Sequence, residues 1–241
     1  MNKSVFTKTL AVFLCLILAV GIFASVYAYD ETYNPDVENI ITERGLQNFE
    51  KANRYSSQFT DVPSSAWYYD NVKAAFEYGL VTGTSATSFN PTGNLTIAEA
   101  VTLAARLNNI YYAEGKLFTQ TSVWYQVYVD YAVEKGIITA NQFANYTKQA
   151  TRAEYTLILA KALPPEALEI VNWVEDGAIP DVKSSDSYGA AVYMLYRAGI
   201  LTGNDDLGTF SPSNSITRAE VSALVTRMSD VSLRKTVTLK N

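Results

Sequence analysis

The sequence of 241 residues contains no histidine and a single cysteine, Cys15. Without histidine, neither a Ser-His-Asp triad nor a Cys-His pair can form, and no metal can be held by imidazole nitrogens. Cys15 lies in an apolar segment near the N-terminus, so the rest of the chain has neither a disulfide nor a thiolate. We therefore expect no metal and no cofactor, and a fold stabilised by its core alone.

Basic residues are also scarce. The chain has 19 Lys and Arg against 24 Asp and Glu, a net charge of −5 at pH 7. Nucleic-acid binding needs clustered Lys and Arg to meet the phosphate backbone. This balance argues against a nucleic-acid partner.

Long apolar runs are limited to residues 10–23, which follow Lys3 and Lys8. The run is shorter than the roughly 20 residues that a membrane span needs. A basic start, an apolar run and a small residue such as Ala28 are typical of a secretory signal peptide. We expect residues 1–28 to be that signal, with no membrane segment after cleavage; an uncleaved N-terminal anchor is the alternative. Cleavage would change the net charge from −5 to −7.

What the sequence does contain is one pattern in three copies. Each copy has three elements: an opening segment, a turn that begins with glycine, and a Thr-x-x-Glu box. The opening contains Asp-Val in the first and third copies and Gln-Thr at the same place in the second. These elements begin at Phe59, Gly79 and Thr96 in the first copy, at Phe118, Gly136 and Thr151 in the second, and at Ile179, Gly199 and Thr217 in the third. The second copy is degenerate.

The spacing inside each copy predicts two helices. Apolar residues precede each turn glycine by seven, four and three positions, as Val72, Ala75 and Phe76 precede Gly79, which places them on one helix face. The glycine suits the C′ position, where φ is positive. After each box glutamate, the first, fourth, fifth and eighth positions are apolar in all three copies. One such pair cannot bury its apolar stripes alone, so we predict an all-α fold in which three helix–loop–helix units pack together.

The Thr-x-x-Glu box is the sequence of a capping box. The threonine hydroxyl accepts from the glutamate N–H, and the glutamate side chain accepts from the threonine N–H. We therefore assign a structural capping role to Thr96 and Glu99, Thr151 and Glu154, and Thr217 and Glu220.

These patterns divide the chain into six parts. They are the signal peptide 1–28, a lead-in 29–58, the first repeat 59–113, the degenerate second repeat 114–163, the third repeat 164–230 and a tail 231–241.

Several motifs of the repeats resemble the S-layer homology domain over residues 59–230. They are the Phe-Thr-Asp-Val opening, Trp67, the Gly-Leu-Val-Thr-Gly turn from Gly79, Phe89-Asn90-Pro91, and the Thr-Arg-Ala-Glu box. The resemblance implies a pseudo-threefold helical bundle with grooves between the repeats. It also implies a secreted bacterial protein at the cell wall or S-layer surface, anchored non-covalently by binding pyruvylated secondary cell wall polysaccharide.

The resemblance assigns the box arginines, Arg152 and Arg218, to the acidic pyruvyl group. A cation in the first turn of a helix faces the positive end of the macrodipole, so it suggests an anionic partner, and the guanidinium fork matches a carboxylate. The alternative is a salt bridge to a neighbouring repeat. The other groove residues that we assign to polysaccharide binding are Asp61, Asp181, Trp67, Gly83 and Gly203. Their alternatives are turn formation for the aspartates and core packing for the tryptophan.

The chain departs from the family pattern at Ile97 for arginine, Gln120 for aspartate, Ala140 for glycine and Ser187 for tryptophan. We predict that each groove joins the aspartate of one repeat to the arginine of the preceding repeat. Asp61 then meets Arg218 and Asp181 meets Arg152. The remaining groove combines Gln120 with Ile97 and is inactive.

Two other functions compete with wall binding. A glycoside hydrolase would use two box glutamates as acid and base about 5–10 Å apart, but each opens a separate helix and has a capping partner, so we expect no enzyme. An envelope or S-layer assembly protein would bind other surface proteins through its helices.

Overall fold

The computed structural model describes residues 45–119 and 121–239, which all belong to one unit of residues 35–241. The predicted signal peptide and Gln120 lie outside the described residues. Six α-helices follow one another there: α2 (Tyr69–Glu77), α3 (Ile97–Tyr111), α4 (Gln126–Glu134), α5 (Arg152–Leu159), α6 (Gly189–Arg197) and α7 (Arg218–Ser229). Two short 3₁₀ helices, η1 (Pro165–Leu168) and η2 (Val231–Leu233), complete the set. This part of the chain forms isolated β-bridges but no strand, so the all-α prediction is confirmed.

The helices form three pairs, which we call the first unit (α2 and α3), the second (α4 and α5) and the third (α6 and α7). Each first helix ends in a Schellman motif. In the first unit, Leu80 N–H donates to the Ala75 carbonyl and Gly79 N–H to that of Phe76, with Gly79 at φ 72°. The other units repeat these bonds around Gly136 and Gly199, both at φ 69°. Glycine is favoured here because a Cβ is penalised at positive φ.

Each second helix begins with a complete capping box, at Thr96, Thr151 and Thr217. In α7 the Thr217 hydroxyl accepts from Glu220 N–H, and Glu220 Oε2 accepts from Thr217 N–H at 2.8 Å. Two N–H groups of the first turn that would otherwise lack partners are thereby satisfied.

Thr217→Ala is expected to lower the free energy of unfolding by about 1 kcal/mol, because one cap is lost. Urea denaturation measures this, with Ser213→Ala at an exposed loop position as the matched control. If Thr217→Ala lowers the free energy of unfolding no more than Ser213→Ala does, the capping role of Thr217 is contradicted.

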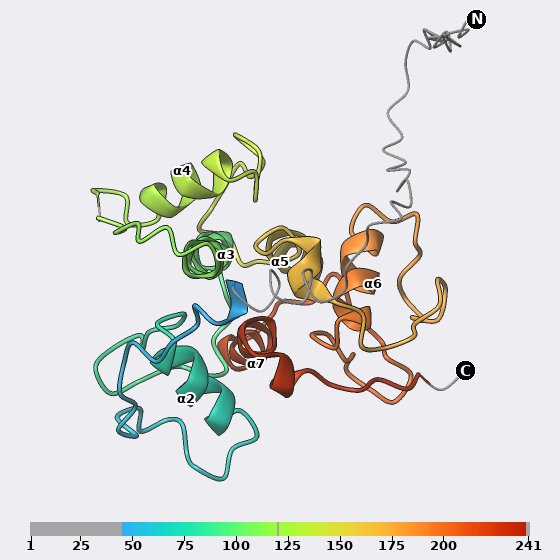
Figure 1. Ribbon diagram of the computed structural model, residues 1–241, viewed down its shortest axis with the longest axis horizontal. Helices are drawn as coiled ribbons and strands as arrows, with labels where there is room; N and C mark the ends of the chain where they lie inside the picture. The colour runs from blue at the N-terminus through green and yellow to red at the C-terminus, as the bar shows by residue number, and fades with distance from the viewer. Residues whose placement is uncertain (1–44, 120, 240–241) are drawn as a thin grey trace, which may run out of the picture. The chain divides into compact units, whose positions relative to one another are not determined.

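The units are arranged cyclically. Each first helix packs mainly on the second helix of the preceding unit: α2 on α7, α4 on α3 and α6 on α5. In Figure 1, α3, α5 and α7 lie together with α2, α4 and α6 outside them. Three isolated bridges link the loops before the second helices in the same order: Asn94 with Thr217, Thr96 with Gln149, and Thr151 with Ser215. Each unit therefore touches both of the others.

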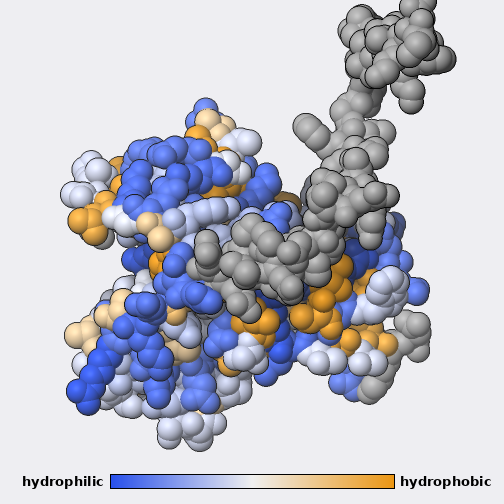
Figure 2. All heavy atoms as spheres, in the orientation of Figure 1, coloured by the Kyte–Doolittle hydropathy of each residue, from blue (hydrophilic) through white to orange (hydrophobic). Residues whose placement is uncertain are grey.

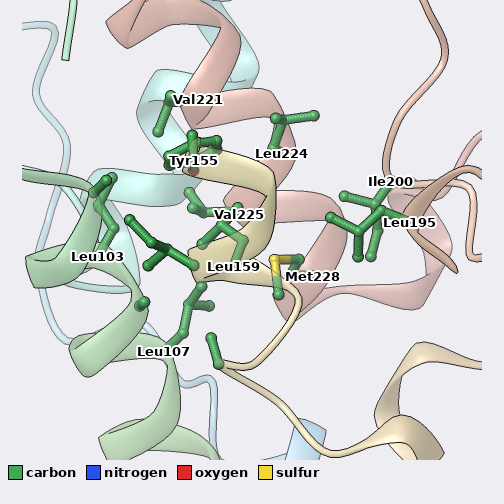
Figure 3. Packing of buried hydrophobic residues seen from close by; sticks show 14 of the residues in the cluster. Leu103, Leu107, Tyr155, Leu159, Leu195, Ile200, Val221, Leu224, Val225 and Met228 are labelled. Carbon is green, nitrogen blue, oxygen red and sulfur yellow. The ribbon is translucent and has the colours of Figure 1, made fainter. Parts of the chain in front are cut away.

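The core lies between the three second helices. All twelve positions that the sequence places after the box glutamates are buried, among them Leu107, Leu159 and Val225 at 0% exposure. Figure 3 shows Leu103 and Leu107 of α3, Tyr155 and Leu159 of α5, and Val221, Val225 and Met228 of α7 turned toward one another. On the face drawn in Figure 2, hydrophilic residues predominate over α2 and α4. The apolar periodicity therefore marks the faces that hold the units together.

None of the helices in the described residues is both long and apolar enough to cross a membrane.

Candidate functional site

Two hollows of similar construction lie where the units meet. The first, which we call the Arg218 groove, has a volume of about 230 Å³ and is lined by Thr82 and Gly83 of the first unit, Trp124 of the second and Arg218 of the third. It also receives Glu99 and Arg106 of α3. Each unit of the fold thus contributes to this one groove.

The second hollow, the Arg152 groove, has a volume of about 200 Å³ and repeats this construction one unit further on. Thr202 and Gly203 of the third unit, Trp67 of the first and Arg152 of the second line it, together with Glu220 and Arg227. The predicted binding residues Trp67, Gly83, Gly203, Arg152 and Arg218 therefore all line one of the two grooves.

Arg218 reaches from the start of α7 into the first unit. Its Nε donates to the Phe89 carbonyl at 2.8 Å and its Nη2 to the Thr82 carbonyl at 2.6 Å. Its Nη1 lies 3.2 Å from Glu99 Oε1, and the guanidinium lies 4.6 Å from the centre of the Phe89 ring. Burial lowers the pKa of Arg218, and Glu99 opposes that shift. The arginine thus clamps the turn to the loop and keeps its planar face against an aromatic ring.

Arg152 makes the corresponding contacts with the loop and the capping glutamate from α5 to the third unit. Its Nε donates to the Phe210 carbonyl at 2.7 Å, and its Nη1 lies 3.1 Å from Glu220 Oε1. Both arginines therefore form a salt bridge to a neighbouring repeat. This is the alternative role that the sequence allows for them. The partner is the capping glutamate, whose Oε2 serves the cap while Oε1 pairs with the arginine.

Asp61 and Asp181 lie behind the loops that carry the two phenylalanines. Asp61 accepts from Phe89 N–H at 2.8 Å, Asn90 N–H at 2.7 Å and the Ser88 hydroxyl at 2.7 Å. Neither aspartate is among the residues that line the grooves, so their geometry is that of loop anchors.

The aspartates are nevertheless linked to the arginines in the pairs that the sequence predicts, through a loop residue rather than inside the groove. Phe89 donates its N–H to Asp61 and offers its carbonyl to Arg218. Phe210 links Asp181 to Arg152 in the same way, with its N–H 2.8 Å from Asp181 Oδ1. In each pair, the aspartate and the arginine together hold the phenylalanine of the loop that lies between them.

Stability is expected to fall as the pH drops below about 4. Burial alone would raise the pKa of Asp61, but the bonds from Phe89, Ser88 and Asn90 outweigh it and leave the pKa lowered. A carboxyl with a lower pKa in the folded state stabilises the fold above its unfolded pKa, and that contribution is lost as the pH falls through the folded value. Thermal unfolding between about pH 2 and pH 7 tests this. An Asp61→Asn variant with an unchanged acid dependence would contradict it.

The tryptophans of the grooves are not core residues. Trp67 is 64% exposed and Trp124 42% exposed, although tryptophan is highly buried on average in folded proteins. Each indole lines a groove whose arginine and turn belong to the other two units. An exposed indole beside a hollow offers an apolar face on which a sugar ring can stack.

The model of the S-layer homology domain matches residues 58–101 and 178–222 of this chain. These two segments are S-layer homology domains. Relatives include an endoglucanase of Bacillus sp. (strain KSM-635), 25% identical over 75% of this chain, and the surface-layer 125 kDa protein of Lysinibacillus sphaericus, 27% identical over 76%. The middle cell wall protein of Brevibacillus brevis is 30% identical over 57%. The chain spans only 19%, 16% and 12% of the length of these relatives.

The two matched segments cover the first helix and the start of the second helix of the first and third units, which supply the turns of the two grooves. The second unit lies outside the matched segments but has the same helix pair, Schellman turn and capping box. Membership of this family implies a location at a bacterial cell surface and attachment to it.

Two further arginines line the grooves and were not predicted from the sequence. Arg106 and Arg227 stand seven positions after the box glutamates, and each donates Nη1 to the carbonyl after its turn glycine, Leu80 O at 2.9 Å or Ile200 O at 2.7 Å. The signal is a basic residue at this position of all three units, with Lys161 in the second.

The remaining junction, between the first and second units, has Ile97 where the others have arginine. Ile97 is fully buried. By the order of the units, this junction would also draw its turn from Ala140 and its indole from position 187, which is Ser187. The residues that depart from the family pattern therefore belong to the same junction.

Proposed function

We propose that this protein attaches to the bacterial cell wall by binding an acidic, pyruvylated wall polysaccharide in the Arg218 and Arg152 grooves. The observation that supports this most is the shared construction of the two grooves, each with two arginines, one carboxylate and an exposed indole. Attachment is non-covalent and involves no catalysis.

The charge balance of each groove favours a singly charged anion. In the Arg218 groove, Arg218 and Arg106 face Glu99, which leaves one positive charge. In the Arg152 groove, Arg152 and Arg227 face Glu220 with the same result. A pyruvyl ketal carries one carboxylate, and guanidinium groups bind carboxylates with charge-assisted hydrogen bonds.

The apolar part of each groove suits the sugar that carries the carboxylate. Leu103 and Val221 line the Arg218 groove beside Trp124. Small-molecule sites combine apolar walls with a few convergent polar groups, and this groove has both. A volume of about 230 Å³ suits one substituted sugar residue rather than a long stretch of polymer.

The box glutamates are poor candidates for acid–base catalysis. In Glu99 and Glu220, one carboxylate oxygen completes a helix cap and the other pairs with an arginine. A glycosidase needs two carboxyl groups that face one substrate with separated pKa values. The same purified protein is therefore proposed to release no reducing sugar from wall polymer.

An assembly role through protein contacts is the second candidate. The segment before the third unit exposes Ile170 at 68% and Trp173 at 86%. Neither residue lines the two grooves. This surface could bind a protein while the grooves hold the wall.

A pull-down with purified wall polymer, with and without its pyruvyl groups, tests the proposal. Binding to the pyruvylated polymer and loss of binding without the groups supports it. Equal binding to both polymers, or to neither, would overturn it. Trp173→Ser should leave the pull-down unchanged, since that side chain lies outside the grooves.

A further inference from the structure

The junction of Ile97 keeps the backbone geometry of the other two. The first residue of each second helix donates its N–H to a loop carbonyl of the adjoining unit: Arg218 to Gly93 at 2.9 Å, Arg152 to Asn214 at 2.8 Å, and Ile97 to Lys148 at 3.0 Å. The loop positions 93, 148 and 214 are therefore structurally equivalent. Only at the Ile97 junction is the loop residue a cation.

That cation pairs with the capping glutamate. Lys148 Nζ forms a salt bridge with Glu154 Oε1, while Glu154 Oε2 accepts from Thr151 N–H at 3.0 Å. Glu99 and Glu220 divide their two oxygens in the same way, between the arginine and the cap. At this junction the cation that pairs with the capping glutamate therefore comes from the loop, at position 148, and not from the first residue of the helix, at position 97.

We propose that Lys148 replaces the missing arginine as the partner of Glu154, and that the Ile97 junction is a structural joint that binds no acidic ligand. The first half stands on the contacts just described. The second half rests on the proposed function, because it concerns the same ligand.

A half-buried carboxylate explains why a replacement is needed. The Glu154 side chain is only 24% exposed, and a carboxylate with one oxygen in a helix cap and no cation on the other would be costly to bury. Lysine supplies the charge from the loop. In agreement, the pKa of Glu154 is lowered: burial would raise it, but Lys148 and the Thr151 backbone outweigh burial.

Lysine does not supply the rest of the arginine's geometry. The side chain of Lys148 is 45% exposed, against 7% for Arg152 and 14% for Arg218. An ammonium group on a flexible stem has no planar fork with which to hold a loop carbonyl, a glutamate and a ligand together. The second unit also lacks the Phe-x-Pro loop whose carbonyl the arginines bind. The junction therefore keeps its ion pair but lacks the guanidinium group and the loop carbonyl that the other two junctions have.

The ion pair is tested without any ligand, by NMR titration of the glutamate carboxyl groups in the full chain. Lys148→Met is expected to raise the pKa of Glu154, and Lys161→Met, which removes another lysine of the second unit, is the matched control. A Glu154 pKa that is unchanged in Lys148→Met, or raised as much by the control, would overturn the replacement.

Calorimetry with a pyruvylated wall-polymer fragment tests the second half. Lys148→Met is expected to leave affinity and stoichiometry within about twofold of the wild type, whereas Arg218→Ala weakens binding at least about tenfold at its groove. A tenfold loss in Lys148→Met would make Lys148 a ligand residue and overturn the joint. If the wild type binds no fragment, the proposed function fails while the titration still decides the ion pair.

Discussion

Replacing both groove arginines, in Arg152→Ala with Arg218→Ala, is expected to weaken binding of a pyruvylated wall-polymer fragment about ten- to a hundredfold. A hydrogen bond to a charged group is worth roughly 1.5–3 kcal/mol, which corresponds to that range of affinity. Isothermal titration calorimetry at one fixed salt concentration measures the change. Arg54→Ala, at an exposed position outside the grooves, is the control and should bind like the wild type.

The same variants must be checked for stability, because the arginines also hold the protein together. Arg218 binds two loop carbonyls and Glu99, so its loss removes the donor for the part-buried Phe89 carbonyl and the partner of Glu99, and should lower the melting temperature. Arg218→Lys keeps the charge but not the fork, so it separates the two roles. Unchanged affinity in folded Arg152→Ala and Arg218→Ala proteins would leave these side chains with a structural role alone.

A monovalent pyruvylated fragment is expected to bind with a stoichiometry near two, which should fall to one in Arg152→Ala. The Arg218 and Arg152 grooves are equivalent in construction, while the third junction has Ile97 in place of the arginine. Two sites on one molecule also raise its avidity for a repeating polymer without any new contact.

Arg218→Ala should reduce the stoichiometry to the same value, so the two single variants serve as controls for each other. A stoichiometry of one in both the wild type and Arg152→Ala, or of three in the wild type, would contradict the assignment of two active grooves.

The sequence is a good guide to the helices and a partial guide to the grooves. Apolar spacing is local information, and the face after Glu99, Glu154 and Glu220 is buried at every predicted position. The glycine after each first helix and the capping box are local too, and both are present. These features could be predicted because each depends on residues within one or two helical turns.

The grooves depend on residues that are distant in the sequence. Arg218 and the Phe89 carbonyl are 129 positions apart, and no local pattern records that contact. The repeat pattern could pair Asp61 with Arg218, but not show that Phe89 stands between them. The second duty of Glu99 escaped prediction for the same reason, since the cap alone explains why a glutamate is there.

The cyclic order of the units makes attachment an all-or-none property of the fold. Because the Arg218 groove takes its turn, indole and arginine from three different units, a chain in which any one unit has detached no longer has a complete site. A ligand that binds only the closed state stabilises that state by mass action, in proportion to the logarithm of its concentration. A polymer present in excess would therefore stabilise the folded protein. A molecule bound to the wall would resist unfolding and proteolysis better than the same molecule in free solution.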